Sequence, residues 1–378
     1  MTRTRRHVLS LIAAWSLASC GTGPVPAQRD TGLPADLRPQ PNAAFDAWLA
    51  GFRTRAASRG LSVTTLADGL ADAGYLPGVV RRDGSQIQTR RSFEDYLSIA
   101  TSDARLAKGR AALRRHGDTL AAVEARFGVS RHIVAAIWGV ESEFGDKRGR
   151  IPVVSATATL AFTGRRGAFW EDQLTAALRI LQAGETPPDR LRGSWAGAMG
   201  HTQFIPTSYL AFAVDFDGDG RRDIWGDDPG DALASAASYL SRNGWRSGLA
   251  WGEEAGTGTL AGRTIRPQAG GPRFTVTGNF DVLKSYNNSD FYAATVGHLA
   301  DRLAGGGPLR GAFPPDANGL TRADRIDLQR ALAARGHELG PIDGVIGPAT
   351  MAAIRDFQAA QGLAVTGQAD RALLARLQ

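Results

Sequence analysis

The amino-acid sequence predicts a mainly α protein (α+β) built from one large and one small folded unit. Apolar residues recur at helical spacing over most of the chain, beginning with Phe45, Trp48, Leu49 and Phe52. This periodicity stops at the glycine- and proline-rich segment LAGGGPLRGAFPP (303–315) and resumes in a shorter stretch behind it. The break predicts two separately folded units joined by a linker.

The large unit is assigned to residues 44–303. Helical spacing predicts further helices in this unit at residues 93–109, 118–127, 171–183, 232–242 and 291–303. A short β-rich patch is expected between residues 258 and 282, where Ile265, Phe274, Val276 and Phe280 are separated by turn residues. The large unit is therefore mostly helical with a small sheet near its end.

Residues 304–318 are predicted to form the linker, and residues 319–378 form the small unit, called the C-terminal unit below. Three apolar stripes predict three helices there: one around Leu328 that ends at Gly336, one that starts at Pro348, and one that carries Leu373 and Leu374.

The N-terminus is predicted to be an export signal, residues 1–20, with a basic start, a short apolar core and small residues at its end. The apolar core is too short to span a membrane. The motif LASC resembles the bacterial lipobox, which would make Cys20 the acylated first residue of a lipoprotein; a plain cleavable signal is the alternative. Residues 21–43 read as a tether. Because Cys20 is the only cysteine, the chain forms no internal disulfide.

The charge of the protein is strongly basic, with a net charge of +7 and a pI near 10.0. This balance favours an anionic partner or surface. The basic residues are scattered and do not form a stripe with interleaved aromatics, which argues against nucleic acid as a partner.

One predicted helix carries a carboxylate inside an apolar run, AAIWGVESEFG (135–145). Ser130 is a suitable N-cap, and Val134, Trp138 and Glu141 share one face of the helix. Desolvation and the nearby helix C-terminus should both raise the pKa of Glu141. A carboxylic acid that stays protonated near neutral pH can serve as a general acid.

The residues alone leave an alternative open, in which Glu141 only ends the helix and forms a salt bridge with Lys147 or Arg148. Glu143 lies about 200° further around the helix, so the two acids cannot face one small target. Glu143 is therefore expected to be a structural or surface acid.

Three motifs in order, AIWGVESEFG (136–145), ATLAF (158–162) and GSWAGAMGHTQFIPTSY (193–209), resemble the B type of membrane-bound lytic murein transglycosylases. The resemblance implies a lysozyme-like catalytic domain that cleaves the MurNAc-GlcNAc β-1,4 bond of peptidoglycan and leaves a 1,6-anhydro end. It implies Glu141 as the single catalytic acid/base, without a cofactor for catalysis. A hydrolytic muramidase of the same fold and a non-catalytic wall-binding scaffold remain as alternatives.

The same resemblance implies a set of substrate-binding residues, for each of which ordinary packing or turn formation is the alternative. They are Ser194, Met199, Gln203, Phe204, Tyr239, Tyr286, Asn287, Tyr292 and, on a weaker match, Tyr96. His201 departs from the family pattern and receives no role.

The acidic segment DFDGDGRRDIW (215–225) resembles an EF-hand loop, with hard oxygen ligands at alternate positions and a glycine at the sharp turn. Gly226 stands at position twelve, where a bidentate Glu is expected, so a later acid must replace it. A structural Ca²⁺ is expected, with a polar turn as the alternative. The predicted ligands are Asp215, Asp217, Asp219, the carbonyl of Arg221, and Asp231, with Asp223 as second choice.

The C-terminal unit, with LQRALAARGHELGPIDGVIGPATMAAIRDFQAAQGL (328–363), resembles a small three-helix peptidoglycan-binding domain. It lacks a His/Cys ligand set, so only binding is expected of it. Together these resemblances imply a monomeric periplasmic lipoprotein, anchored through Cys20 to the outer membrane of a bacterium, whose partners are peptidoglycan glycan strands and the lipid membrane.

Overall fold

The computed structural model describes residues 32–85, 92–163 and 165–378. The predicted signal segment, Cys20 and the first part of the predicted tether lie outside the described residues. Within the described part of the chain, no helix combines the length and the apolar composition that crossing a bilayer requires.

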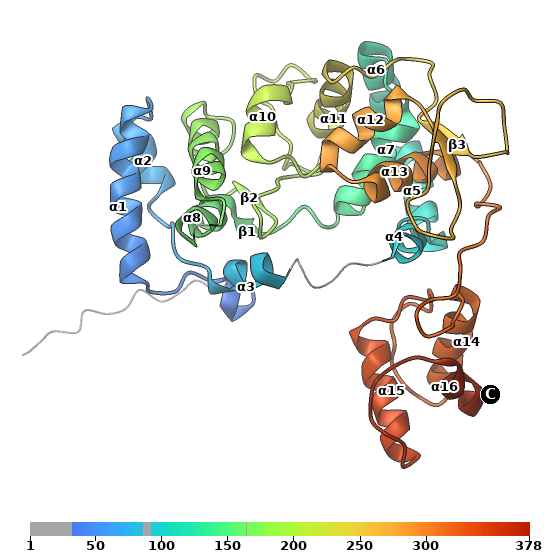
Figure 1. Ribbon diagram of the computed structural model, residues 1–378. Helices are drawn as coiled ribbons and strands as arrows, with labels where there is room; N and C mark the ends of the chain where they lie inside the picture. The colour runs from blue at the N-terminus through green and yellow to red at the C-terminus, as the bar shows by residue number, and fades with distance from the viewer. Residues whose placement is uncertain (1–31, 86–91, 164) are drawn as a thin grey trace, which may run out of the picture.

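The protein is mainly helical, as the sequence predicts (Figure 1). The first helices are the 3₁₀ helix η1 (Ala35–Leu37), α1 (Ala43–Ser58), α2 (Val63–Gly69), α3 (Pro77–Ser85), α4 (Phe93–Ala100), α5 (Asp103–Arg115) and α6 (Gly117–Phe127). The central and later helices of the large unit are α7 (Arg131–Ser142), α8 (Val153–Thr163), α9 (Gly167–Gln182), α10 (Pro206–Phe212), α11 (Gly230–Arg242), α12 (Gly278–Asn287) and α13 (Asp290–Leu303).

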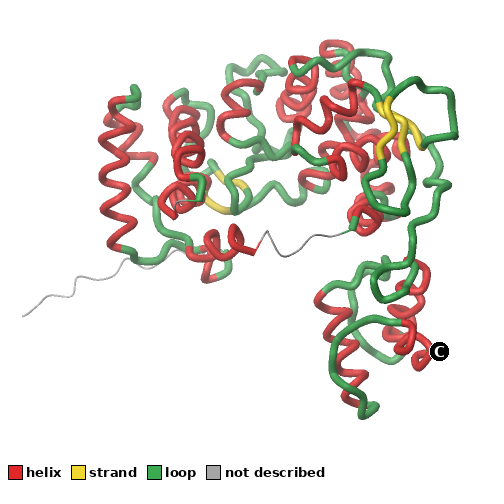
Figure 2. The backbone as a smooth tube through the Cα atoms, in the orientation of Figure 1, coloured by secondary structure: helices red, strands yellow, loops and turns green. Residues whose placement is uncertain are grey.

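The strands are short and form two small antiparallel sheets (Figure 2). The first pairs β1 (Ile151–Pro152) with β2 (Arg192–Gly193). The second has the order β3-β5-β4, with β3 (Gly252–Glu254), β4 (Arg263–Ile265) and β5 (Phe274–Val276).

Two predicted boundaries are wrong. The helix expected over residues 93–109 is two helices, because the side chain of Ser102 accepts a hydrogen bond from the Arg105 N–H and starts α5 afresh. The β-rich patch begins earlier than expected, at β3, and Phe280 belongs to α12, whose N-cap is Thr277.

Two large hydrophobic cores divide the described part of the large unit, and a third, smaller core gathers residues such as Leu37, Val79 and Trp170. One large core gathers buried residues of α1, α2, α8 and α9, and the other large core gathers those of α4 to α7, α11 to α13 and the three-stranded sheet. Tyr239 and Tyr286 pack against both cores. The junction between the two cores is therefore lined by aromatic side chains.

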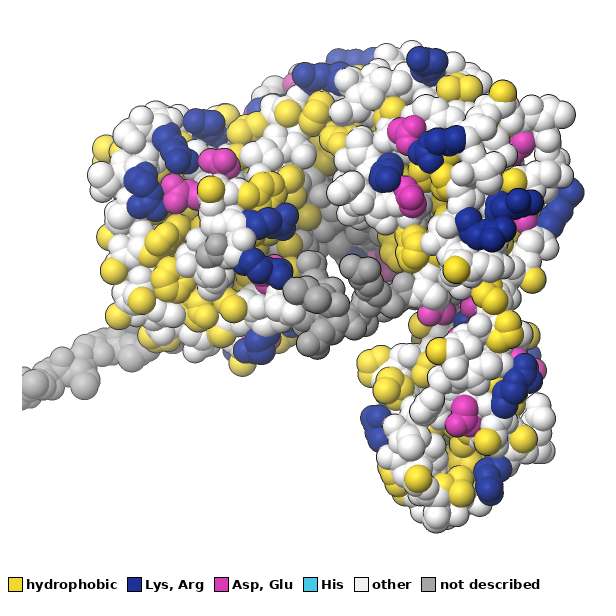
Figure 3. Space-filling view, viewed as in Figure 1, with side chains coloured by type: hydrophobic (Ala, Val, Ile, Leu, Met, Phe, Trp, Pro, Cys, Tyr) yellow, Lys and Arg dark blue, Asp and Glu magenta, His cyan; other side chains and the backbone are white. Residues whose placement is uncertain are grey.

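The C-terminal unit has a hydrophobic core of its own. It contains α14 (Arg322–Ala333), α15 (Pro348–Ala360) and α16 (Arg371–Leu377), and Pro348 stands at the start of α15 as predicted. Figure 1 shows this unit beside the α4 end of the large unit. Figure 3 shows lysine and arginine side chains dispersed over this face of the molecule, without a continuous basic stripe.

Candidate active site

Helix α7 carries Glu141 in its last turn. Ser130 caps the helix, since its side chain accepts a hydrogen bond from the His132 N–H at 3.3 Å, as predicted. The residues from Ile133 to Gly139 are all buried, so the helix is surrounded by protein along most of its length. Glu141 therefore lies in the last turn of a largely buried helix.

The chain turns sharply after α7. Glu143 and Phe144 both have left-handed backbones, with φ of 53° and 59°. Phe144 folds back so that its ring packs edge-on against Trp138 at a centroid distance of 5.8 Å. Gly139 permits this, because a Cβ there would lie 2.5 Å from the Phe144 ring. This turn ends the helix at Ser142, one residue after Glu141.

Glu141 itself has a strongly perturbed acidity. The side chain keeps partial access to solvent but is densely surrounded by protein atoms. Burial raises the pKa of Glu141 from its ordinary 4.5 to about 7, while the hydroxyl of Tyr292 acts in the opposite direction. That hydroxyl is buried and makes no regular hydrogen bond with any of the described residues, Glu141 included. At neutral pH a large fraction of Glu141 therefore carries a proton.

The salt-bridge alternative for Glu141 does not occur among the described residues. Lys147 pairs with Glu143 at 2.6 Å, and Arg148 donates to the carbonyls of Trp225 and Gly226 and pairs with Asp227. Neither cation is directed to Glu141.

Glu143 has the opposite environment to Glu141. Its carboxylate pairs with Arg105 at 3.0 Å as well as with Lys147. Burial acts to raise the pKa of Glu143, but the hydrogen bond from Lys147 and the charge of Arg105 lower it below its ordinary value. Glu143 is thus an ionised acid in an ion-pair cluster at the end of α7, which is a structural role.

Aromatic side chains form one wall next to Glu141. The rings of Tyr286 and Tyr292 are stacked with centroids 6.0 Å apart, and Tyr239 packs edge-on against Tyr286 at 4.9 Å. Phe204 lies 5.9 Å from Tyr286, so the wall continues into the loop that follows β2. Burial raises the pKa of both Tyr286 and Tyr292, which keeps their phenols neutral.

Hydrogen bonds fix the orientation of this wall. The Tyr286 hydroxyl donates to the carbonyl of Thr202 at 2.8 Å, and the Tyr239 hydroxyl donates to the carbonyl of Ser285 at 2.8 Å. Tyr96, on α4, acts electrostatically on Tyr292 and so lies on the same side of the site. Asn287 is exposed at the end of α12, next in sequence to Tyr286.

The loop between β2 and α10 supplies the polar part of the site. Ser194 accepts a hydrogen bond from the Ala198 N–H at 3.1 Å, and the buried Met199 pairs through its backbone with Phe204. Gln203 has a φ of 53°, and its amide donates to the carbonyls of Gly200 at 2.8 Å and Arg148 at 3.1 Å. These contacts place Gln203 against the segment that follows α7.

Gly149 lets that segment lie directly on β2. Its φ is +88°, and a Cβ at this position would stand 2.1 Å from the backbone carbon of Gly193. Only glycine fits both the backbone conformation and the close approach.

Comparisons with known proteins agree with this geometry. The domain family described as "Transglycosylase SLT domain" matches residues 44–264 and 255–301, and a "Putative peptidoglycan binding domain" matches residues 321–377. The chain is 30% identical to the membrane-bound lytic murein transglycosylase B of Escherichia coli strain K12, over 79% of this chain and 98% of that protein.

The chain belongs to the lytic transglycosylases that act on peptidoglycan.

Solved structures support the same assignment for this transglycosylase. SltB3 from Pseudomonas aeruginosa, in complex with NAG-NAM-pentapeptide, is 42% identical with a TM-score of 0.69, over 89% of this chain and 100% of that chain. The lytic transglycosylase Slt35 of Escherichia coli, in complex with calcium, is 26% identical with a TM-score of 0.58, over 70% of this chain and 93% of that chain.

The acidic loop of the transglycosylase brings part of its predicted ligand set together. Asp215, Asp217 and Asp219 each offer a carboxylate oxygen, and these oxygens lie within 4.8 Å of one another. The backbone of Arg221 donates its N–H to Asp219 at 2.8 Å, as in a tight loop around a central point. Three converging hard oxygen donors fit a calcium ion.

Asp231 does not join this group. One of its carboxylate oxygens accepts from the Phe216 N–H and the other from the Asp223 N–H, each at 2.8 Å. Burial raises the pKa of Asp231, and the two backbone donors oppose that effect. The structure thus gives Asp231 the role of fastening the two ends of the loop to the start of α11.

His201 is a site residue to which sequence reasoning gave no role. Its Nδ1 accepts from the Trp138 Nε1–H at 3.0 Å, and its Nε2 lies 2.8 Å from the carbonyl of Gly226. Its own carbonyl accepts from the Ser142 hydroxyl at 2.6 Å. A neutral His201 protonated on Nε2 satisfies both ring contacts, and burial lowers its pKa accordingly. The residue joins α7 to the loop that follows the acidic segment, and its position in the motif 193–209 does not indicate this contact.

Proposed function

We propose that Glu141 is the single acid/base of this lytic transglycosylase and that it cleaves the bond between N-acetylmuramic acid and N-acetylglucosamine. The observation that carries the proposal is a carboxyl group with a pKa of about 7 at the junction of the two cores. Within the described residues no other carboxylate contributes to the pKa of Glu141, and Glu143 is held in ion pairs on another side of the helix end. A paired-carboxylate mechanism therefore has no second member here.

The reaction begins with the protonated form. Glu141 donates its proton to the glycosidic oxygen, and the bond from that oxygen to the anomeric carbon of muramic acid breaks. The acetamido group of the substrate stabilises the positive charge that develops at this carbon.

The ionised Glu141 then acts as base. It accepts the proton of the C6 hydroxyl of the same sugar, whose oxygen bonds to the anomeric carbon and closes the 1,6-anhydro ring. The acid returns to its starting state and no water is consumed. Alternation between acid and base is most efficient when the pKa lies near the working pH, as burial arranges for Glu141.

The remaining site residues orient the glycan. Tyr239 and Tyr286 present ring faces and edges suited to packing against sugars, and the buried Tyr292 and Phe204 support them from behind. Ser194, Gln203 and Asn287 offer polar groups for the sugar substituents, Met199 packs behind them, and Tyr96 completes the wall from α4.

Product analysis tests this proposal against the hydrolytic alternative. Purified sacculi are digested and the soluble products are examined by mass spectrometry; anhydro ends are expected. Reducing ends would assign a muramidase reaction that uses water. The variant Glu141→Gln should lose activity by about 10²–10⁴-fold or more, the range that general acid–base groups contribute. Glu143→Gln is the matched control and should retain most of the activity.

Three further assignments belong to the proposed function. The C-terminal unit, residues 319–378, holds the enzyme on glycan strands while residues 44–303 carry out the cleavage, in line with the matched peptidoglycan-binding domain. Asp215, Asp217 and Asp219 hold a structural Ca²⁺, supported by their convergence and by the calcium complex of Slt35. Acylated Cys20 anchors the protein to the membrane on the periplasmic side, which metabolic labelling with a fatty acid and a Cys20→Ser control would test.

A further inference from the structure

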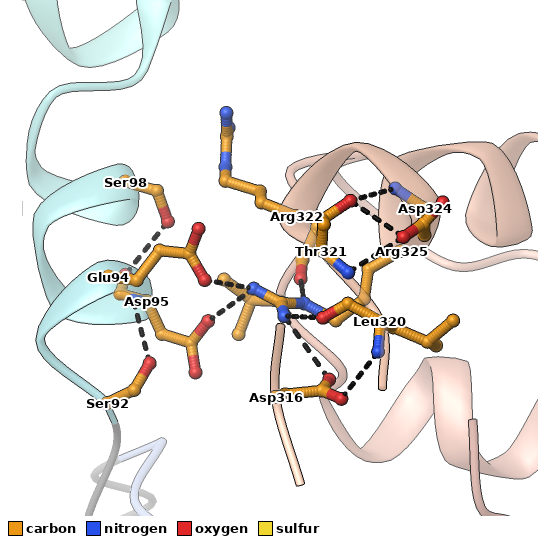
Figure 4. A network of polar contacts seen from close by, with 12 residues as sticks. Ser92, Glu94, Asp95, Ser98, Asp316, Leu320, Thr321, Arg322, Asp324 and Arg325 are labelled. Carbon is orange, nitrogen blue, oxygen red and sulfur yellow. Dashed lines mark hydrogen bonds and ion pairs between the residues drawn. The ribbon is translucent and has the colours of Figure 1, made fainter. Parts of the chain in front are cut away.

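A buried arginine joins the C-terminal unit to the large unit. Arg325 lies in the first turn of α14, and only 5% of its side chain is exposed. Figure 4 shows its guanidinium group between α4 on one side and the first residues of the C-terminal unit on the other. A charged group is rarely buried to this extent unless every polar contact is satisfied.

All three nitrogens of Arg325 are used. Nε donates to the carbonyl of Gly344 at 2.6 Å, and Nη1 donates to the carbonyl of Leu320 and to Asp316, both at 3.2 Å. Nη2 crosses to α4, where it donates to Glu94 at 2.7 Å and lies 3.4 Å from Asp95. One planar side chain thus holds its own domain, the end of the linker and the large unit together.

Glu94 and Asp95 form the acidic side of this contact on α4. Glu94 is itself buried, with 10% of its side chain exposed, and its backbone N–H donates to the side chain of Gln268 at 3.0 Å. Three carboxylates, those of Glu94, Asp95 and Asp316, surround the single guanidinium. Without Arg325 these negative charges would repel each other in a place that water reaches poorly.

The linker is packed against the large unit as well. The N–H groups of Arg310 and Gly311 donate to the side chain of Glu254, and the ring of Phe313 lies 6.0 Å from that of Phe93. Residues 304–318 are therefore not a free tether in this arrangement. They lead the chain along the large unit to the Arg325 contact.

The docked units border a common cleft of about 1070 Å³. Thr101, Lys108 and Glu143 line it from the large unit, and Arg322 and Ile342 line it from the C-terminal unit. Through Glu143 the cleft reaches one side of the end of α7, and neither Glu141 nor the aromatic wall lines it. Side chains of both units can therefore contact one ligand only while the units are docked.

We propose that Arg325 is a positioning residue, which docks the C-terminal unit on α4 so that a glycan strand bound by that unit is held in one fixed register relative to the catalytic domain. The inference rests on the proposed function of the C-terminal unit as a glycan binder. Arg325 touches no reacting atom. It acts through Glu94 and Asp95, which lie on the same short helix as Tyr96 of the substrate wall.

The test compares full-length variants on two substrates. Arg325→Ala is measured with long soluble glycan strands and with a tetrasaccharide of the same glycan that is too short to engage both units. A C-terminal unit on a free tether gives a lower effective concentration of the second binding site than a docked unit does. KM of the variant for long strands should therefore rise by about tenfold. kcat and KM for the tetrasaccharide should stay within about twofold of wild type.

Docking is followed separately by small-angle X-ray scattering without substrate. Arg325→Ala should increase the radius of gyration, and the variant Glu94→Gln/Asp95→Asn should do the same from the opposite side of the contact. Arg325→Lys keeps the charge but loses the planar fork, and should give an intermediate KM for long strands. Arg330→Ala is the matched control, because Arg330 lies on the same helix, is exposed and pairs only within α14 with Asp327.

The outcomes separate this proposal from the function on which it rests. Unchanged scattering in both docking variants would overturn it, as would an equal loss of activity on strands and tetrasaccharide. If Arg325→Ala does not fold, the Glu94→Gln/Asp95→Asn variant decides in the same way. Equal KM values of the wild type for both substrates would instead reject glycan binding by the C-terminal unit, while the scattering still reports whether Arg325 docks it.

Discussion

The substitution Glu141→Gln should stabilise the folded protein at alkaline pH while it removes activity. Glutamine has nearly the shape of a protonated glutamic acid but cannot ionise. In the wild type, burial raises the pKa of Glu141 from 4.5 to about 7, so ionisation of this group in the folded state is unfavourable. The Gln variant has no such group to ionise, so its folded state is not destabilised in this way.

The size of the effect follows from the pKa values. A rise from 4.5 to about 7 corresponds to about 3 kcal/mol at ~1.4 kcal/mol per pH unit. Between these two pH values the folded wild type binds more protons than the unfolded chain, so its free energy of unfolding falls as the pH rises. The stabilisation by Gln should therefore be near zero at pH 4, grow between pH 4.5 and 7, and level off above pH 7.

Urea unfolding followed by tryptophan fluorescence at pH 4.5, 6 and 8 measures this difference. Glu143→Gln is the control with the opposite sign, because the pKa of Glu143 is lowered by its cationic partners. Its wild-type carboxylate stabilises the fold above the ordinary pKa, and that stabilisation is lost as the pH falls. A Glu141→Gln variant that is less stable than wild type at pH 8, or whose stability difference does not depend on pH, would refute the assignment of a buried protonated acid.

Three further changes have defined outcomes. Tyr292→Phe removes the hydroxyl that lowers the pKa of Glu141, so the alkaline limb of the pH–activity profile should move to higher pH; a shift to lower pH would contradict the contact. Calcium at a hundredfold excess over its Kd should stabilise the wild type by about 2.7 kcal/mol and so raise its melting temperature. Asp217→Asn should abolish most of that rise. Calorimetry with and without a chelator decides this, and an equal shift in both proteins would exclude the loop. Gly149→Ala should lower the free energy of unfolding by about 3 kcal/mol, since it combines a left-handed backbone with a backbone clash. Gly184→Ala, also at positive φ but with open space around it, should cost only about 1 kcal/mol in the same urea titration.

Local patterns predicted the elements of this protein well where short-range physics dominates. Ser130 was predicted as the cap of α7 and Pro348 as the first residue of α15, because capping and proline preference act within one helical turn. The split between α4 and α5 was missed, since the apolar spacing continues through Ser102 although its side chain starts a new helix. The register of apolar residues alone does not separate one helix from two.

The acidity of Glu141 could also be anticipated in direction. A carboxylate inside a nearly continuous apolar run, at the end of a helix, is desolvated in any compact fold. Whether it would be neutralised by Lys147 or Arg148 could not be settled from spacing, because both lie within reach along the chain. After the left-handed turn at Glu143, Lys147 pairs with Glu143, and Arg148 donates to the carbonyls of Trp225 and Gly226. Neither cation therefore neutralises Glu141.

The sequence by itself determined the two units, most helices, the acid in its apolar helix and the acidic loop, since each depends on residues within a few turns of one another. Only the tertiary structure decided what His201 joins, that Asp231 fastens the loop ends, and that Arg325 bridges the two units. Those contacts connect residues that are far apart in the chain, such as the 231 positions between Glu94 and Arg325. A buried charge or ring nitrogen takes its role from the partners that folding brings within about 3 Å of it, and these leave no periodic trace in the sequence.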